Sequence, residues 1–377
     1  MKPRVLILGA GFAGLELATS LSEMHGDAVD VCVIDKADGF VFGFAKLDVM
    51  FGKASLDGVK LPYRDFVKPG VRLVREAVRA IDPAAKRVTT DAGTHEADFL
   101  VIALGADYDV STTPGVVLGD NEFYSVPGAA HLASVLPTFT QGNAVVGVCG
   151  APYKCPPAPS ECVLMLHDYL RERGVRDACR ITLVNPLPSP VPPSPETSAA
   201  LIAAFAERNI TYLPNRRVKS VDRARNVVVL DDASELPCNL FLGVPKNRAP
   251  DVVVATGLTV DGWVTVDPRT LETKVPGVYA VGDLANTGAP KAGVFAEGAA
   301  KAVAANISAA IRNQVGTAKN PGAGSCYIEF GANRIARVDV DFFSGPKPTG
   351  TFYEPSETLR ADKKSFGSTR RARWFGK

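Results

Sequence analysis

The chain has 377 residues, about two and a half times a typical ~150-residue domain, and this length predicts two or three domains. Hydrophobic residues make up 46% and charged residues 22%, an ordinary globular composition that excludes disordered, collagen-like and coiled-coil proteins. The 42 Lys and Arg against 40 Asp and Glu leave a net charge of +2, so no large field gathers nucleic acid or anionic lipid. The seven cysteines form no CxxC pair, which indicates neither a disulfide scaffold nor a zinc module.

The N-terminus resembles a secretory signal, because Lys2 and Arg4 precede an apolar stretch. The glycines that follow argue against a signal, since they fall at turn and helix-start positions that such a peptide does not need. No uncharged apolar run of 18 residues occurs, and the closest, residues 292–311, is interrupted by Glu297 and Lys301. We therefore expect a cytoplasmic protein without a transmembrane span.

Apolar runs of strand length alternate along the chain with amphipathic segments of helix length. A strand at 5–8, a helix at 13–25 and a strand at 29–34 form a βαβ unit, which implies a parallel sheet and an α/β fold. Further strands are predicted at residues 100–103, 144–149, 180–184, 252–255 and 278–281.

Two of these runs, at 100–103 and 252–255, lead into the same pattern of a small residue, any residue and Gly. A chain that leaves one domain after the first run and returns at the second would explain both. The C-terminal segment is rich in Gly, Pro and aromatics, and it is predicted to be a loop-rich cap. The predicted division is a discontinuous first domain at 1–112 and 250–315, a second domain at 113–249 and the cap at 316–377.

A glycine motif follows the first predicted strand. Gly9, Gly11 and Gly14 form GxGxxG between a strand and a helix, and Asp35 closes the next strand. Gly9 permits the tight turn, Gly11 lets the backbone approach a pyrophosphate, and Gly14 lets the helix pack on the strand. The helix N-terminus offers amide donors, and Asp35 would accept from a ribose hydroxyl.

The corresponding turn of the second domain lacks this motif. After the strand at 144–149 the chain carries four prolines, Lys154 and Cys155 instead of glycines. Proline removes amide donors, so the turn is poorly suited to hold a pyrophosphate. It is suited to hold Cys155 rigidly at the start of a helix, where the dipole and Lys154 would stabilise a thiolate. From the residues alone, a nucleophile and a small core residue are about equally supported for Cys155.

The segment 155–159, Cys-Pro-Pro-Ala-Pro, followed by Glu161, resembles the cysteine segment of sulfide:quinone oxidoreductases and of the flavoprotein of flavocytochrome c sulfide dehydrogenase. Residues 278–283 resemble the second FAD motif of this family, and residues 290–297 resemble the helix start that points at the flavin. Residues 324–327 resemble the segment with the second redox cysteine, which is Cys326 here. The similarity extends over almost the whole chain.

This resemblance implies a glutathione-reductase-like fold with two Rossmann-like domains, the first of which holds FAD. It implies that Cys155 and Cys326 face the flavin as a disulfide that hydrosulfide attacks, and that Glu161 relays a proton. Electrons from the sulfur donor would pass through FAD to a quinone or a cytochrome. The expected FAD-binding residues are Gly9, Gly11, Phe12, Ala13, Gly14, Asp35, Lys36, Val78, Ala103, Gly105, Gly282, Asp283, Lys291, Gly293 and Val294.

The chain departs from the family in two respects. No cysteine lies in 116–133, where sulfide:quinone oxidoreductases often carry a third one, and this argues against a long polysulfide relay. No cysteine lies in 39–51 either, and Cys32 falls within a strand, so we expect noncovalent FAD. The other cysteines are interpreted as structural, with Cys162 the strongest exception because it follows Cys155 by about two helical turns.

Other candidate sites carry less signal. The four histidines form no metal-binding pattern, so no metal site is expected. The tail at 370–375 mixes cations with aromatics, which is compatible with contact to anionic lipid or a partner and equally with a solvated end that docks one aromatic. Oligomeric state is open, and a homodimer is one possibility.

Two other functions remain open from the sequence. One is an NAD(P)H-dependent flavin oxidoreductase resembling type II NADH dehydrogenases, against which the prolines at 152–159 argue. The other is a redox-sensing flavoprotein that binds a partner and turns over poorly.

Overall fold

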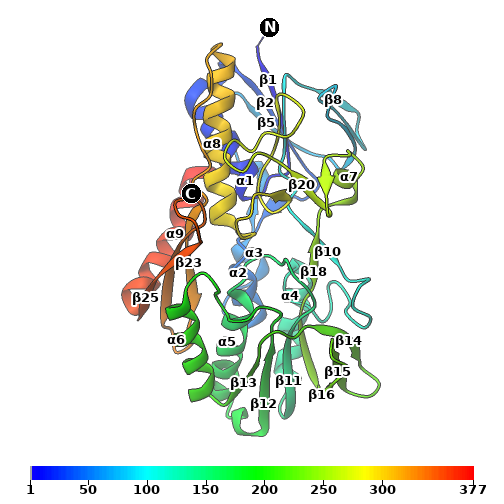
Figure 1. The fold of residues 1–377 in the computed structure, drawn as a ribbon, viewed down its shortest axis with the longest axis vertical. Coiled ribbons are helices and arrows are strands. Elements are labelled where there is room, and N and C mark those ends of the chain that lie inside the picture. The colour runs from blue at the N-terminus through cyan, green and yellow to red at the C-terminus, as the bar shows by residue number, and fades with distance from the viewer. Residues whose placement is uncertain (1) are drawn as a thin grey trace.

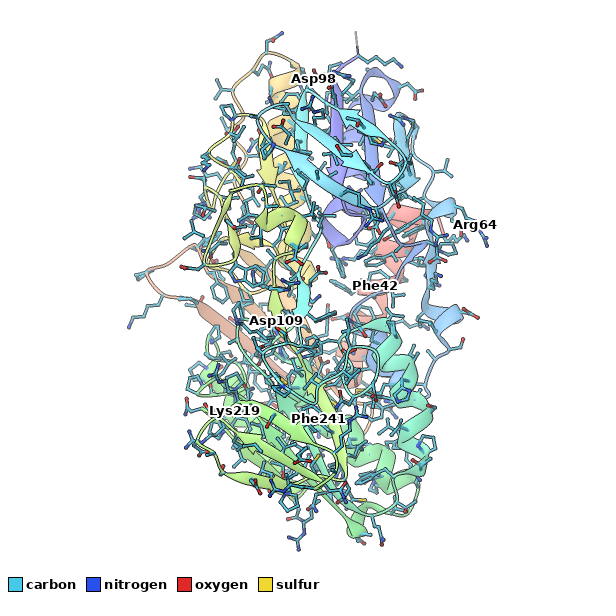
Figure 2. All side chains as sticks on the ribbon, turned by 90° about the vertical axis from the view of Figure 1, so that its right-hand side faces the viewer. Phe42, Arg64, Asp98, Asp109, Lys219 and Phe241 are labelled. Carbon is cyan, nitrogen blue, oxygen red and sulfur yellow. The ribbon has the colours of Figure 1, made fainter. Side chains whose placement is uncertain are left out.

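The computed structural model describes residues 2–377, and it has two lobes stacked along the long axis of the molecule (Figure 1). One lobe contains the N-terminus, and the C-terminal part of the chain lies along one flank of both lobes. In the side view of Figure 2, Asp98 marks the first lobe and Phe241 the second, while Phe42 and Asp109 lie at the level where they meet.

The first lobe is built on a five-stranded parallel sheet. Its strand order is β21 (Val278–Ala280), β9 (Phe99–Ile102), β1 (Arg4–Leu8), β2 (Asp30–Asp35) and β5 (Val71–Arg75). Helices α1 (Phe12–His25) and α8 (Gly293–Ile311) pack against each other and on the sheet, as Figure 1 shows. Successive side chains of β1 alternate between the two faces, so Ile7 contacts the helices and Leu6 contacts the opposite layer. This lobe contains both glycine segments predicted to bind a nucleotide.

The second lobe repeats the arrangement with four parallel strands. Their order is β13 (Ile210–Leu213), β12 (Cys179–Val184), β11 (Gly142–Val148) and β17 (Leu240–Val244). Helices α5 (Ala158–Glu172) and α6 (Pro195–Glu207) flank this sheet (Figure 1). The predicted α/β class with two parallel sheets is confirmed.

The two lobes are joined by a pair of antiparallel strands, β10 (Asp107–Asp109) and β18 (Lys246–Arg248). The chain therefore leaves the first lobe along one of these strands and returns along the other. The strand predicted at 252–255 is wrong, because Asp251–Val254 forms the short helix α7 after Pro250. Only Val253 of this run is buried and Val254 is 42% exposed, so tertiary packing overrides the β propensity of three consecutive valines.

The C-terminal segment is not loop-rich as predicted. It forms an antiparallel sheet of β23 (Ala323–Glu329), β24 (Ile335–Asp341) and β25 (Thr349–Ser356), followed by α9 (Glu357–Phe375). Its glycines and prolines occur largely at the turns, while Ile328, Val338 and Val340 alternate toward the core of the second lobe. The segment thus covers both lobes rather than forming a separate cap (Figure 1).

Smaller elements complete the described chain. The remaining helices are α2 (Ala45–Met50), α3 (Leu56–Val59) and α4 (Val126–Val135), and the remaining strands are β3 (Gly39–Phe40), β4 (Leu61–Pro62), β6 (Val78–Asp82), β7 (Arg87–Thr90), β8 (Thr94–Glu96), β14 (Val218–Asp222), β15 (Val227–Leu230), β16 (Glu235–Pro237), β19 (Thr259–Val260), β20 (Trp263–Thr265) and β22 (Ala285–Asn286).

Within residues 2–377, α8 is the one helix whose length and composition would suffice to cross a membrane. Most of it is buried, with Ala300, Val303 and Ile307 packed in the core of the first lobe. Buried core helices pass the same test of length and composition, so α8 is weak support for a span.

The last turn of α9 docks on the first lobe. Trp374 is fully buried, and its ring lies 5.7 Å from that of Phe12 and 5.6 Å from that of Phe40. Its indole N–H donates to the buried carboxylate of Glu16 at 2.8 Å, and Arg373 pairs with the same carboxylate at 2.9 Å. Since Phe375 is buried as well, the tail is more firmly docked than the single anchored aromatic considered from sequence.

Candidate functional site

A cavity opens at the carboxyl ends of β1 and β9, beside the N-termini of α1 and α8. We call it the nucleotide cavity. Ligands of open α/β sheets bind at this edge. Its wall comprises Gly11, Phe12, Ala13, Phe40, Val41, Gly43, Phe44, Lys46, Leu47, Ala103, Gly105, Phe123, Tyr124, Lys154, Cys155, Ala158, Glu161, Gly282, Asp283, Lys291, Ala292, Gly293 and Ala296.

The turn before α1 has the geometry of a phosphate cradle. Gly9 has φ of +101°, and a Cβ on Gly14 would lie 1.8 Å from the Gly9 carbonyl oxygen, so neither position tolerates a side chain. A Cβ on Gly11 would meet no atom within 4 Å, because this residue faces open space. Gly11 is also the N-cap of α1 and no side chain caps the helix, which leaves its first amides available to an anion. These features fit the pyrophosphate of a bound dinucleotide.

Asp35 stabilises this turn from the end of β2. Its carboxylate accepts the amide of Ala10 at 2.7 Å and that of Ala37 at 2.8 Å. Each carboxylate oxygen keeps acceptor capacity, so the group can still receive a ribose hydroxyl. Lys36 beside it is exposed and Val78 lies on β6, and neither lines the nucleotide cavity.

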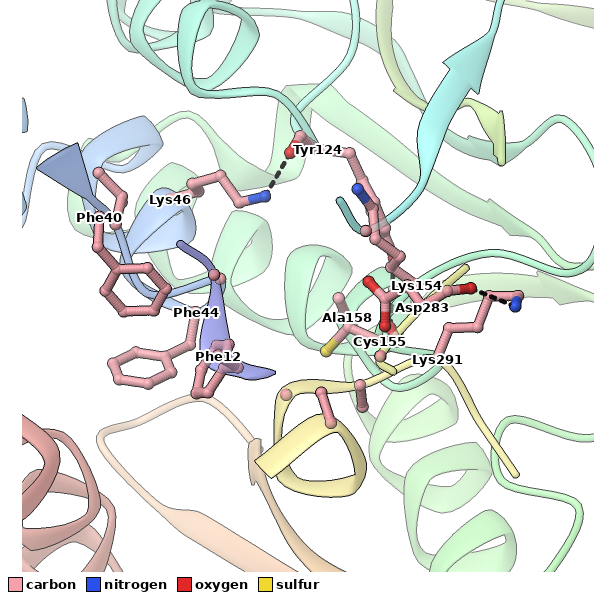
Figure 3. A pocket seen from close by; sticks show the side chains of 18 of the residues that line it. Phe12, Phe40, Phe44, Lys46, Tyr124, Lys154, Cys155, Ala158, Asp283 and Lys291 are labelled. Carbon is pink, nitrogen blue, oxygen red and sulfur yellow. Dashed lines mark hydrogen bonds between the residues drawn. The ribbon is translucent and has the colours of Figure 1, made fainter. Parts of the chain in front are cut away.

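The opposite wall of the nucleotide cavity is charged. Asp283 lies near Lys46, Lys154 and Lys291, and burial raises the pKa of its carboxyl while the lysines oppose that shift. The Lys291 ammonium donates to the Asp283 carbonyl and lies 3.5 Å from the centre of the Trp263 ring. Burial lowers the pKa of Lys291 to about 8. Figure 3 shows this charged wall facing the phenylalanines, with Cys155 between the two.

The turn between β11 and α5 places Cys155 in this cavity. Cys155 has φ of +49°, a left-handed conformation that is uncommon for a residue with a side chain. Its amide donates to the Lys291 carbonyl at 2.8 Å, and the Lys154 amide donates to Asn247 Oδ1 at 2.7 Å. The four prolines at 152–159 supply no amide, and the amides of Lys154 and Cys155 are used within the protein, which disfavours a second pyrophosphate site.

The predicted helix-stabilised thiolate at Cys155 is wrong. Helix α5 begins at Ala158, after Cys155, and the Lys154 ammonium turns away to the Ala106 carbonyl at 2.9 Å and the Tyr108 ring. Cys155 is open to the cavity, yet many protein atoms surround its sulfur. This crowding raises its pKa, and the nearby Glu161 and Cys326 raise it further. The thiol is therefore the resting form.

Glu161 lies on the first turn of α5 and lines the same cavity. Its side chain is almost fully buried, and its Oε1 accepts the amide of Glu329 at 3.0 Å. Burial raises the pKa of Glu161 to about 7, against the opposing charge of Lys363. A carboxyl that titrates near neutral pH beside a cysteine is suited to accept and return a proton.

Cys326 on β23 lies close enough to Cys155 to raise the pKa of that thiol, although 171 residues separate the two. Burial raises the pKa of Cys326 itself to about 12. All seven cysteines are free thiols in the structure. Cys326 lines a different space, an apolar cavity of about 600 Å³ whose wall includes Pro156, Trp263 and Phe342. The two cysteines thus open toward different cavities.

The other cysteines are buried away from the cavity. Cys162, the strongest exception considered, is fully buried in the core of the second lobe, and burial places its pKa well above the usual value. Among residues 2–377 no group of His, Cys, Asp and Glu could hold a metal ion.

Several cavity residues escaped the sequence analysis. Phe40 and Phe44 form an aromatic wall with Phe12, while Tyr124 donates from its hydroxyl to the Cys155 carbonyl at 3.3 Å. Lys46 donates to the Tyr124 carbonyl, as Figure 3 shows, and lowers the pKa of Cys155. No motif marks these residues, and only the clustering of aromatics after β2 could have hinted at them.

The structure brings most predicted site residues to the nucleotide cavity. Gly9, Gly14 and Asp35 support the wall from behind, while the side chain of Val294 packs toward Gly324, outside the cavity. The predicted residues that line the cavity are Gly11, Phe12, Ala13, Ala103, Gly105, Cys155, Glu161, Gly282, Asp283, Lys291 and Gly293.

Comparison with known proteins agrees with this architecture. Residues 3–310 match the family model of the pyridine nucleotide-disulphide oxidoreductases. The chain belongs to this family. Its members typically bind FAD, and the glycine cradle and the charged wall of this chain fit that cofactor.

Individual relatives show which members of the family this chain resembles. A sulfide-quinone reductase of Aquifex aeolicus is 26% identical over 374 residues, covering 88% of this chain and 82% of the relative. The solved structure of the sulfide:quinone oxidoreductase from Aquifex aeolicus superposes with a TM-score of 0.86 at 23% identity, over 98% of this chain and 91% of that one. A type II NADH:quinone oxidoreductase of Staphylococcus epidermidis is 36% identical, but over only 30% of this chain and 28% of its own. The protein is a flavin oxidoreductase that resembles sulfide:quinone oxidoreductases.

Proposed function

We propose that the protein oxidises sulfide or a related sulfur compound with Cys155, Cys326 and noncovalent FAD, and passes the electrons to a quinone or a cytochrome. The observation that carries the proposal is that Cys155 and Glu161 line the cavity of the glycine cradle, with Cys326 near enough to raise the pKa of Cys155. The similarity to sulfide-quinone reductases over most of the chain supports a sulfide donor and a quinone acceptor. The division at 1–112 with 250–315, 113–249 and 316–377 is part of the proposal.

The cysteines would act as an oxidised pair in the forward reaction. Hydrosulfide attacks the disulfide at Cys326, which opens to the apolar cavity; the disulfide breaks, and a persulfide forms on Cys326 while Cys155 leaves as a thiolate. When bound, FAD accepts two electrons. Cys155 supplies them because it lies on the cofactor side: the outer sulfur of the Cys326 persulfide bonds to Cys155 as the two electrons leave, which restores an oxidised pair with one sulfur atom inserted. Glu161 removes the proton that the sulfur donor brings.

The charged wall has a role in this reaction. Lys291 and the N-terminus of α8 would stabilise negative charge on a reduced isoalloxazine, and Lys46 would favour the thiolate of Cys155 at the moment it forms. The aromatic wall of Phe12, Phe40 and Phe44 would exclude water from the ring.

An anaerobic titration tests the proposal. Sulfide should bleach the flavin of the purified protein far faster than NADH or NADPH, because the turn 149–159 carries four prolines without an amide hydrogen where a second dinucleotide would need donors. Full bleaching at micromolar NADH would instead establish the type II NADH dehydrogenase alternative. Flavin that no small donor reduces would favour the redox sensor.

The mode of FAD attachment has its own test. Acid or heat should release all flavin from the polypeptide, because residues 39–51 contain no cysteine to tether it. Yellow colour that remains on the denatured chain would contradict noncovalent binding.

A further inference from the structure

A charged cluster lies next to Glu161 and lines a hollow other than the apolar cavity. Lys363 on α9 pairs with Glu329 at 2.5 Å, and the side chains of the two residues are only 15% and 14% exposed. The amide of Glu329 donates to Glu161. Asp48 on α2 lies in the same electrostatic environment, since Lys363 lowers its pKa while burial and Glu329 raise it.

This cluster lines a second hollow. Asp48, Glu329 and Lys363 line a groove of about 520 Å³ between α2 and α9. We call it the basic groove, because its other charged residues are Lys53, Arg360, Lys364 and Arg371. The Lys363 ammonium lies 5.6 Å from the ring of Phe44, which lines both the basic groove and the nucleotide cavity. Phe44 therefore lies between the two spaces, with Glu161 on the side of the nucleotide cavity and Asp48, Glu329 and Lys363 on the side of the groove.

The proposed reaction requires a proton to cross this boundary. Oxidation of hydrosulfide to the level of zero-valent sulfur releases two electrons and one proton, and a flavin that accepts the pair takes one proton with it. Transfer of the pair to a quinone then consumes one further proton, and transfer to a cytochrome releases one. In both cases one proton is exchanged between the buried cavity and solvent in each turnover.

We propose that Asp48, Glu329 and Lys363 form the route by which buried Glu161 exchanges this proton with solvent, through the basic groove rather than through the apolar cavity. This inference rests on the proposed function. The S–H bond of the donor breaks as the O–H bond of Glu161 forms; that O–H bond then breaks, Asp48 takes the proton, and water in the groove receives it. The proton that the reduced flavin takes up, and the one that a quinone consumes, enter from the groove by the same steps in reverse. No electrons move in these steps.

Lys363 acts as a positioning residue whose positive charge lowers the pKa values of Glu161 and Asp48. Burial alone would lower the pKa of its ammonium, but Glu161, Glu329 and Asp48 outweigh burial and raise it, so the residue stays charged. Its positive charge stabilises the ionised form of the Glu161 and Asp48 carboxyl groups relative to the neutral form. The ionisable groups whose charges act on Glu161 or respond to it are Lys363, Glu329, Asp48, Cys155, Cys162, Cys326 and Tyr124.

The first test needs no sulfide. In a Cys326→Ser background, the rate of Cys155 alkylation by iodoacetamide is followed from pH 5 to 9 by mass spectrometry, and Glu161 should appear as an inflection near pH 7. Lys363→Met should move the inflection up by about one unit. Lys363→Arg should leave it in place, as should Lys364→Met, the control at the exposed neighbouring lysine of the groove. An inflection that does not move in Lys363→Met overturns the role of Lys363.

The second test follows the proton itself. Asp48→Ala should slow anaerobic flavin reduction by sulfide about tenfold, raise the solvent deuterium isotope effect and respond to added formate, which the basic groove can admit. Asp57→Ala, at an exposed carboxylate on nearby α3, should change none of these. Unchanged kinetics in Asp48→Ala overturn the route. If sulfide does not reduce the wild-type flavin, the proposed function fails, and the alkylation profile still decides whether Lys363 controls Glu161.

Discussion

The two lobes contain the same strand, turn and helix, and the turns have opposite chemistry. In the first lobe the turn from β1 to α1 carries the glycines, no side chain caps the first amides of α1, and Gly11 faces open space. In the second lobe the turn from β11 to α5 carries four prolines, the amides of Lys154 and Cys155 are bonded within the protein, and the turn presents a sulfur atom. The comparison shows how one backbone arrangement can hold a nucleotide or a reactive side chain, depending on whether glycine or proline follows the strand.

The largest expected effect comes from removing the sulfur of the second turn. Cys155→Ser should leave FAD content unchanged and slow flavin reduction by sulfide by about 10³-fold or more. Cys326→Ser should do the same, and the double variant should be no worse, because each cysteine is useless for exchange without the other. Stopped-flow absorbance of the flavin measures all three, and additive losses would contradict a cysteine pair.

Glu161→Gln tests the proton acceptor beside that turn. Since the pKa of Glu161 is raised to about 7, the wild-type group is a competent base above pH 7 and loses this role as the pH falls through 7. The variant should be about 10²-fold slower at pH 8, and the difference should shrink toward pH 6. Titration of the donor affects both proteins equally, so the ratio of their flavin reduction rates isolates Glu161. A ratio independent of pH would argue against it.

The role of the first turn is tested by placing a side chain at Gly11, which faces open space. Gly11→Val should weaken FAD binding about thirtyfold, or ~2 kcal/mol, because the new side chain occupies the space of the pyrophosphate. The apoprotein should unfold at nearly the wild-type temperature, since no protein atom lies within 4 Å of the added Cβ. Flavin fluorescence on titration measures the affinity, and thermal unfolding of the apoprotein measures the stability. An unaltered affinity would show that the glycine cradle does not bind FAD.

The smallest effect is expected at the glycine of the second turn. A Cβ on Gly150 would lie 3.1 Å from both Cβ and Cγ of Lys246, which would have to give by only a few tenths of an ångström. Gly150→Ala should therefore change FAD affinity by less than about twofold and sulfide reduction equally little. A loss comparable to that of Gly11→Val would show that the two turns are not chemically distinct.

The features that could be predicted are those that a short stretch of sequence specifies. The glycine cradle, its strand and its helix were predictable because spacing within 30 residues specifies them. The aromatic wall and the Lys363 cluster were not, since Phe44, Tyr124, Glu329 and Lys363 come together only through packing of distant segments. The thiolate prediction failed for the same reason, because the surroundings of Cys155 are set by other elements.

The docking of α9 links two segments that lie far apart in the chain. Trp374 packs against Phe12 of the nucleotide turn, 362 positions away in the sequence. Synthesis proceeds from the N-terminus, so the nucleotide turn obtains its aromatic backing only after α9 has been made. A chain that ends before α9 would expose Phe12, Phe40 and Phe42 and hold its cofactor poorly. Retention of the yellow cofactor would thus mark those molecules in which α9 has been synthesised and docked.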